Sequence, residues 1–196
     1  MKINGTPTRT IWLAQDGWAV EIIDQTRLPH ELVTVRLESL ADAAHAIKAM
    51  LVRGAPLIGA TAAYGMALAA RANSSDLALT VAYNILHATR PTAINLKWAL
   101  DEMIAALGKV PEADRVAAAY ARAAEICDED VAINSAIGDN GAKLIAEAWE
   151  AAKAKGAERV NVLTHCNAGW LATVDWGTAL APIYKAHDAG IPVHVW

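Results

Sequence analysis

The residues best suited to chemistry in this sequence are a cysteine and two arginines, each beside the end of a predicted element. Cys166 stands in the stretch VLTHCNAGW (162–170), where an apolar run ends. Ligands in open α/β sheets bind at the carboxyl ends of strands, so this position suits a reactive group. A thiol there exchanges a proton with a substrate if a cation or a helix N-terminus brings its pKa near neutrality. Because free cysteines are often buried as small apolar side chains, a packing role stays open.

Two other candidates are weaker. His165 precedes Cys166, and its side chain should alternate to the opposite side at the end of a strand. Cys127 lies in the helical stretch AEICDEDVA (124–132) and is predicted to pack in the core. Two cysteines so far apart make neither a disulfide framework nor a metal knuckle. We therefore predict no metal site and a reduced thiol at each position.

The stretch VRGAPLIGATAAYG (52–65) predicts an anion site. Arg53, Gly54 and Ala55 lead into a helix that begins near Pro56, and the N–H groups and dipole of a helix N-terminus attract anions. The planar guanidinium of Arg53 adds a fork of donors that matches a phosphate. The alternative is an ordinary Gly-Pro turn before a tightly packed alanine helix.

The second arginine stands in HATRPTAINLKWAL (87–100). Pro91 keeps Arg90 extended and outside the helix that follows, which favours a guanidinium facing a ligand or a carboxylate. A surface arginine in a loop is the alternative. Together with Arg53 and Cys166 it would suit a small phosphorylated substrate. The sequence contains neither a Walker loop nor a dinucleotide glycine fingerprint.

The predicted secondary structure changes along the chain from strands to helices. Residues 10–14 and 18–24 alternate as a hairpin closed by Asp16-Gly17, and residues 32–37 follow as a third strand. Periodicity and caps then predict helices over residues 39–52, 56–72, 75–89, 93–107 and 113–151, the last of them broken at 138–141 by Gly-Asp-Asn-Gly.

After residue 156 the pattern becomes strand, helix, strand, over residues 159–164, 178–190 and 191–196. This is the βαβ unit of a parallel sheet. We therefore predict an α/β fold: a helical domain with a small antiparallel sheet over residues 1–125, then a linking helix and the first part of a Rossmann-like domain over residues 126–196. Two strands do not bury both faces of a parallel sheet, so this second domain is expected to be incomplete.

Composition narrows the function. The 196 residues are 55% hydrophobic and 19% charged, which allows a sizeable core. A net charge of −4 without a basic block argues against nucleic-acid binding. We see no secretory leader and no apolar run of membrane-spanning length. The composition therefore indicates a globular protein of the cytoplasm.

Three segments carry a resemblance to the methylthioribose-1-phosphate isomerase family: residues 52–65, 90–99 (RPTAINLKWA) and 163–196. The likeness spans nearly the whole chain. It implies a cytoplasmic homodimer that converts 5-methylthioribose 1-phosphate to 5-methylthioribulose 1-phosphate in methionine salvage, without a metal or organic cofactor. It also implies that a substrate site lies between the helical and Rossmann-like domains.

The same resemblance assigns roles to residues. It implies that Arg53, Gly54, Ala55 and Arg90 bind the substrate, and that Cys166 stabilises the transition state or transfers a proton. Family members continue into a segment with Asp-Glu-Thr-Arg-Pro, a binding Gln, a catalytic Asp and an Asn-Lys pair. None of these can be placed in this chain. It is therefore expected to be a fragment, a truncated gene product, or half of a split enzyme whose complementary chain carries the remainder.

Two other functions remain open on the sequence. The substrate can be another pentose 1-phosphate, namely 5-deoxyribose 1-phosphate or ribose 1,5-bisphosphate. The chain can also be a non-catalytic binding subunit, because the regulatory subunits of the translation initiation exchange factor are similar to this family. Convergence of Arg53, Arg90 and Cys166 on one site would favour an enzyme.

Overall fold

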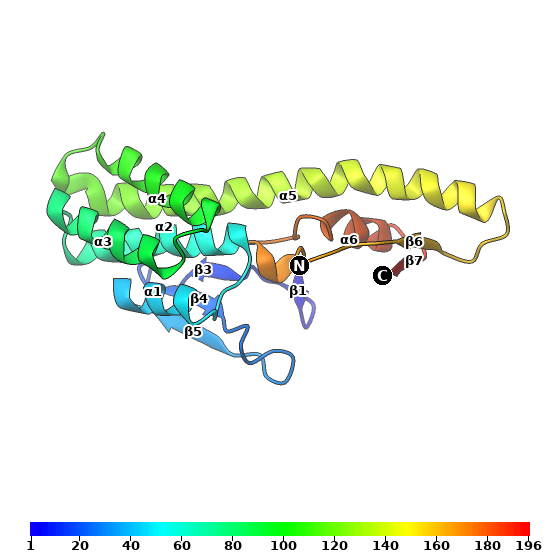
Figure 1. The fold of residues 1–196 in the computed structure, drawn as a ribbon, viewed down its shortest axis with the longest axis horizontal. Coiled ribbons are helices and arrows are strands. Elements are labelled where there is room, and N and C mark those ends of the chain that lie inside the picture. The colour runs from blue at the N-terminus through cyan, green and yellow to red at the C-terminus, as the bar shows by residue number, and fades with distance from the viewer.

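The computed structural model describes residues 1–196 and shows an elongated molecule built along one long helix (Figure 1). The elements follow in the order β1 (Lys2–Ile3), β2 (Thr6–Pro7), β3 (Ile11–Leu13), β4 (Val20–Ile23), β5 (Thr34–Leu37), α1 (Leu40–Lys48), α2 (Ala55–Ala72), α3 (Asp76–Thr89), α4 (Ile94–Leu107), η1 (Glu112–Asp114), α5 (Arg115–Lys153), β6 (Val160–Val162), η2 (Trp170–Ala172), α6 (Ala181–Asp188) and β7 (Val193–Val195). Helices α1–α4 gather at one end of α5, and β6, α6 and β7 lie along its other half.

The predicted three-stranded sheet is confirmed. Strands β3, β4 and β5 are antiparallel neighbours, with Ile11 opposite Ile22 and Val20 opposite Leu37. These four side chains are buried in the main core, so one face of the sheet packs on the helices. The short β1–β2 hairpin was not predicted, because two residues per strand are too few to show an alternating pattern.

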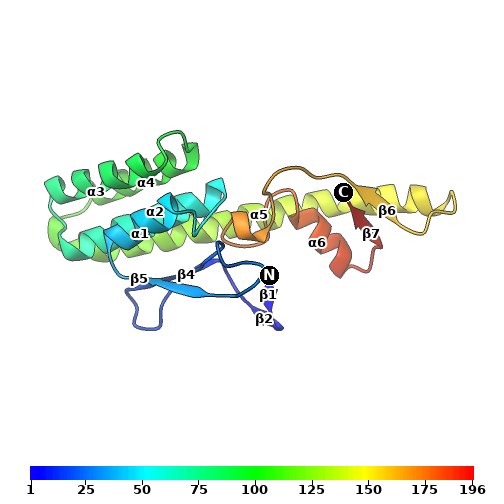
Figure 2. The same cartoon turned by 60° about the horizontal axis from the view of Figure 1, so that its bottom comes forward.

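The helical bundle is also confirmed and centres on α2. This helix is buried on all sides from Leu57 to Ala70, as expected for an apolar helix without a polar face. Figure 2 shows α2 between the sheet on one side and α3 and α4 on the other. Ser39 caps α1 and Ser75 caps α3, each accepting a hydrogen bond from a first-turn backbone N–H.

The predicted break in the long helix is wrong. Helix α5 runs without interruption for 39 residues, and Gly138 and Gly141 stay helical within it. Both glycines face α6: a Cβ on Gly141 would lie 2.4 Å from Cγ of Pro182, and one on Gly138 would lie 3.0 Å from Cδ of Lys185. These glycines therefore allow close packing of α6, and the packing outweighs their poor helix propensity.

We expect Gly141→Ala to destabilise the protein by about 1–3 kcal/mol, because the new methyl group would overlap Pro182. In an exposed helix the same change would stabilise by about 1 kcal/mol. Asn140→Ala is the control, since Asn140 is the exposed neighbour in the same helix. It should gain a few tenths of a kcal/mol, about what helix propensity gives. Urea unfolding measures both, and a Gly141→Ala variant more stable than the parent would contradict the packing of α6 on this glycine.

The βαβ unit is confirmed. Strands β6 and β7 are parallel, with Val160 opposite Val193, and α6 connects them while packing on α5. Both β6 and α6 are shorter than predicted at each end. The proposed boundary between residues 125 and 126 falls inside α5, so the division into two domains stays a prediction. None of the helices combines the length and the apolar character needed to cross a membrane.

Candidate active site

The segment after β6, residues 163–180, turns back from the parallel strands to the helical bundle. Thr10, just before β3, anchors it: the Thr10 N–H donates to the Val174 carbonyl (3.0 Å) and its hydroxyl donates to the Thr173 carbonyl (2.5 Å). Gln25, after β4, donates from Nε2 to the Leu171 carbonyl (2.6 Å). We call this segment the return loop. Its second half is thus held by residues near the sheet.

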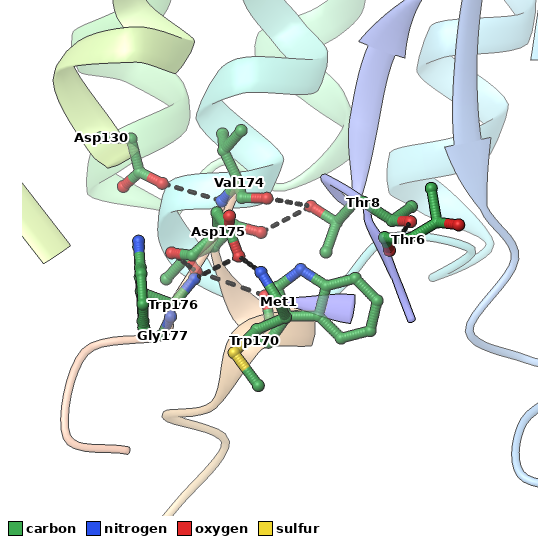
Figure 3. Close-up of polar contacts among 11 residues, drawn as sticks. Met1, Thr6, Thr8, Asp130, Trp170, Val174, Asp175, Trp176 and Gly177 are labelled. Atoms are coloured by element: carbon green, nitrogen blue, oxygen red, sulfur yellow. Dashed lines mark hydrogen bonds and ion pairs between the residues drawn. The ribbon is translucent and has the colours of Figure 1, made fainter. Parts of the chain in front are cut away.

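Two carboxylates complete this attachment (Figure 3). Asp130 of α5 accepts the Val174 N–H at Oδ2 (2.7 Å). Asp175 forms an ion pair with the amino group of Met1 and accepts the Trp176 N–H (2.7 Å). Burial raises the pKa of the Asp130 carboxyl above its usual range. The second half of the return loop therefore has a defined position relative to α5.

Cys166 lies in the first half of the return loop, four residues beyond the end of β6, as the sequence predicts. Its side chain is exposed and its backbone is left-handed, with φ +71°. This conformation is uncommon for a residue with a side chain and is found more often at functional sites. Because β6 ends at Val162, strand alternation does not reach His165, and both His165 and Cys166 are exposed. The alternation that predicted opposite orientations for His165 and Cys166 therefore does not apply, because neither residue lies in a strand.

Cys127 is a packing residue, as predicted. It is 2% exposed and belongs to the main core. Burial raises the pKa of its thiol to about 12, which keeps it protonated at neutral pH. The two cysteines thus differ sharply, and only Cys166 is accessible to a substrate.

The Arg-Gly-Ala turn touches the return loop. Gly54 is the N-cap of α2, with φ +102° and no side chain to cap the helix. A Cβ at this position would lie 2.4 Å from both Cα and the carbonyl oxygen of Ala172. Arg53 and Ala55 on either side are exposed. The predicted anion site and the segment that carries Cys166 are therefore in direct contact.

Arg90 is the C-cap of α3 and is exposed. Its carbonyl accepts the Ala93 N–H (3.0 Å), which closes the turn before α4. The first turn of α4 lies against α2, because a Cβ on Gly59 would be 3.0 Å from the Asn95 carbonyl oxygen. The turn that contains Arg90 therefore leads into a helix whose first turn packs on α2, the helix that follows Arg53.

Neither of these two arginines is neutralised within the chain. Five other arginines form salt bridges with carboxylates, namely residues 9, 27, 36, 115 and 122. Arg53 and Arg90 form none, and they stand at turns that precede helix N-termini. An unpaired guanidinium beside free backbone N–H groups is suited to a phosphate.

Buried polar atoms without a partner collect at the return loop. Thr164 Oγ1 and Trp170 Nε1 belong to it, and Gln25 Oε1 belongs to the residue that anchors it. Such atoms are normally hydrogen-bonded, so each of the three lacks the partner that a buried polar atom usually has. Gln25, Thr10 and Asp130 were not predicted as site residues, because no local pattern marks a residue that acts on a loop far away in sequence.

A family model described as the Initiation factor 2 subunit family matches residues 51–196. The chain belongs to this family. Across all 196 residues it is 74% identical to a methylthioribose-1-phosphate isomerase from Paramagnetospirillum magneticum, covering 100% of this chain and 53% of the relative. It is 63% identical to the isomerase of the same name from Rhodospirillum rubrum, over 100% of this chain and 51% of that protein. The chain thus spans about half the length of the curated relatives it matches.

Solved structures of the family have the same fold. A 5-methylthioribose 1-phosphate isomerase from Pyrococcus horikoshii matches with a TM-score of 0.82 at 35% identity, over 97% of this chain and 52% of that one. The delta subunit of translation initiation factor eIF-2B from A. fulgidus matches with a TM-score of 0.79 at 36% identity, over 96% of this chain and 54% of that one. The predicted α/β fold class is therefore confirmed, and the family includes proteins named as enzymes and as initiation factors.

Proposed function

We propose that this chain supplies the substrate-binding turn and the reactive cysteine of an aldose–ketose isomerase that converts 5-methylthioribose 1-phosphate to 5-methylthioribulose 1-phosphate. The observation that carries the proposal is the 74% identity, along the whole chain, to an isomerase of that name. The contact between Gly54 and Ala172 supports it, since it brings the Arg-Gly-Ala turn to the loop of Cys166.

The proposed roles follow from the chemistry of the substrate. Its anomeric oxygen carries the phosphate, so the ring does not open as it does in a free aldose. Opening breaks the bond between C1 and the ring oxygen, which takes up a proton. Hydrogen then moves from C2 to C1 with its electron pair, or leaves C2 as a proton while C1 gains one, and the C2 hydroxyl loses its proton to give the ketone. Arg53, Arg90 and the N-terminus of α2 would hold the phosphate. Cys166, at an exposed turn in the first half of the return loop, would donate or accept one of these protons.

The proposal includes a partner. An isomerase of this kind would act as a homodimer or together with the segment that corresponds to the remainder of its relatives, and a cytoplasmic location remains a prediction. Activity is therefore best measured in a chimera in which this chain replaces the matching N-terminal portion of the Paramagnetospirillum magneticum isomerase. We expect the chimera to isomerise 5-methylthioribose 1-phosphate. Absence of turnover with a folded chimera would contradict the proposed function.

Arg53→Ala and Arg90→Ala are each expected to lower kcat/KM of the chimera about 10- to 100-fold, mainly through KM. Each change removes a charge-assisted hydrogen bond to phosphate, typically about 1.5–3 kcal/mol. Arg159→Ala is the control. Arg159 is also exposed, but it stands just before the start of β6, whereas Cys166 follows the end of that strand. Steady-state kinetics measure all three variants. Unchanged kinetics in both Arg53→Ala and Arg90→Ala would contradict the proposal that these two residues bind the phosphate.

A second function is favoured by the match to the eIF-2B delta subunit. On that alternative the chain would belong to a binding subunit that acts by assembly, without turnover. The exposed Cys166 and the two arginines without carboxylate partners favour the enzyme, since assembly alone requires neither a free thiol nor unpaired arginines. The chimera assay separates the two functions.

A further inference from the structure

Asp130 links the middle of α5 to the return loop (Figure 3). Its Oδ2 accepts the Val174 N–H (2.7 Å). Val174 is 0% exposed and its N–H has no other acceptor in the chain, so water does not replace the carboxylate. A buried N–H without a partner costs free energy, and a charged acceptor binds it more strongly than a neutral one. Asp130 is therefore a strong constraint on the position of the return loop at Val174.

The second half of the return loop in turn packs against the first half, which carries Cys166. A Cβ on Gly177 would lie 2.4 Å from the carbonyl carbon of Gly169. The Leu180 N–H donates to the carbonyl of Ala168 (3.3 Å), two residues after Cys166. The backbone next to Cys166 therefore depends on where the second half of the loop lies.

The second half also carries the contact with the Arg-Gly-Ala turn. Ala172, two residues before Val174, is the residue that a Cβ on Gly54 would overlap. A shift of the loop at Val174 would therefore affect both this contact and the segment of Cys166.

Asn134, one turn later in α5, holds the carboxylate of Asp130. Its Nδ2 donates to the Asp130 carbonyl (2.8 Å) and to Asp130 Oδ1 (2.9 Å). The residue is 1% exposed, and its own Oδ1 is buried without a donor. The opposite orientation of the amide would place that oxygen against two acceptors, so the observed orientation is the one that suits an ionised Asp130. Asn134 thus stabilises the carboxylate although its own oxygen stays unpaired.

No cation neutralises Asp130. It takes part in none of the salt bridges, and the charged groups around it have partners of their own: Arg9 pairs with Asp128, Arg122 with Glu129, Lys185 of α6 with Asp139, and the Met1 amino group with Asp175.

The half-buried carboxyl of Asp130 has a perturbed pKa. Burial raises the pKa, the hydrogen bonds from Val174 and Asn134 lower it in part, and the charge of Asp175 raises it. The folded protein then binds the proton more readily than the unfolded chain, so stability falls as the pH rises through the range in which Asp130 ionises. A group with a perturbed pKa next to a candidate site is itself a candidate for a functional role.

We propose that Asp130 is a positioning residue for the isomerase reaction: its carboxylate fixes the return loop on α5, and with it the segment of Cys166 and the contact with the Arg-Gly-Ala turn. This inference rests on the proposed function and deepens it, because it names a group that acts through the loop and is needed in its ionised form. Turnover should slow as the pH falls and Asp130 takes up a proton, since a neutral carboxyl accepts the Val174 N–H less strongly than a carboxylate does.

The test compares the chimera with its Asp130→Asn variant, in which the side chain keeps its shape but does not ionise. We expect kcat for 5-methylthioribose 1-phosphate to fall about tenfold at about pH 8, the size of one weakened charge-assisted hydrogen bond. As the pH is lowered, Asp130 of the parent takes up a proton, and the ratio of the two kcat values should approach one. Titration of the substrate phosphate or of Cys166 affects parent and variant alike, so it cancels in this ratio. In urea unfolding the variant should be no less stable than the parent, because it removes a half-buried charge.

Two further variants complete the test. Asn134→Ala removes a hydrogen bond that favours the ionised form, so the decline of kcat toward acid pH should begin about one pH unit higher than in the parent. Asp139→Asn is the control: Asp139 is an exposed carboxylate of the same helix, and it accepts a hydrogen bond from Lys185 of α6 (2.6 Å) instead of one from the return loop. This control should keep the kcat of the parent at every pH.

The possible outcomes are distinct. A kcat ratio that approaches one at acid pH, with parent-like kinetics for Asp139→Asn, supports the proposal. If the parent is active and Asp130→Asn loses nothing, or loses the same factor at every pH, the positioning role is overturned while the proposed function stands. A folded parent chimera without turnover contradicts the proposed function itself, and this inference with it.

Discussion

Replacing Cys166 by alanine or serine is expected to lower turnover of 5-methylthioribose 1-phosphate by the chimera at least about a hundredfold. Positioned acid–base groups typically contribute 10²–10⁴-fold, and neither side chain replaces a thiol in proton transfer near neutral pH. The effect should appear in kcat, because the phosphate contacts proposed for the two arginines are left intact. Stability should be unchanged, since the side chain is exposed and packs on no core residue.

Cys127→Ala is the matched control for this prediction. It removes the other thiol of the chain from a buried position, so it should cost about 1–2 kcal/mol of stability without loss of turnover. Steady-state kinetics and thermal unfolding of both variants separate catalysis from folding. Near-parent turnover in Cys166→Ala would remove this cysteine from the mechanism.

Gly54→Ala is expected to reduce kcat/KM at least about a hundredfold and to destabilise the protein by about 2–4 kcal/mol. The added Cβ would meet the backbone of Ala172 at 2.4 Å, and backbone atoms cannot move aside as a flexible side chain can. The φ of +102° adds strain for any residue with a side chain. Relief requires that the first turn of α2 or the return loop move, and either movement changes the position of the Arg-Gly-Ala turn relative to the return loop that carries Cys166.

Gly156→Ala is the control that separates the effect of backbone strain from the effect of steric overlap with Ala172. Gly156 also has a positive φ, +83°, but nothing lies within 4 Å of its Cβ position. This variant should lose about 1 kcal/mol through backbone strain alone and keep its activity. Kinetics and urea unfolding measure both variants. If Gly54→Ala keeps its activity and loses only as much stability as Gly156→Ala, the contact between the Arg-Gly-Ala turn and the return loop is not needed for activity.

Local signals explain why most of the fold could be predicted. The Asp16-Gly17 turn gives the β3–β4 hairpin, and Ser39 and Ser75 mark the starts of α1 and α3 through hydrogen bonds within a few residues. The break predicted at Gly138 and Gly141 failed for the converse reason. Their role depends on α6, a helix about 40 residues later, and no local pattern reports such a tertiary contact.

The candidate site shows the same difference between local signals, which can be read from the sequence, and long-range contacts, which cannot. Arg53, Arg90 and Cys166 were predicted as site residues because each stands at an element end that the sequence marks. The parts that shape the site were not found, because they are long-range contacts: Gln25 reaches Leu171, and Asp130 reaches Val174, 44 residues away.

The central claim is that Arg53, Arg90 and Cys166 act on one pentose phosphate. A crystal structure of the chimera with 5-methylthioribulose 1-phosphate tests it most directly. We expect the phosphate at the N-terminus of α2 in contact with both guanidinium groups, and Sγ of Cys166 within about 3.5 Å of an oxygen or carbon at C1 or C2, the range of reacting atoms. A sugar phosphate bound away from the Arg-Gly-Ala turn, or one whose C1 and C2 lie out of reach of Cys166, would contradict the claim.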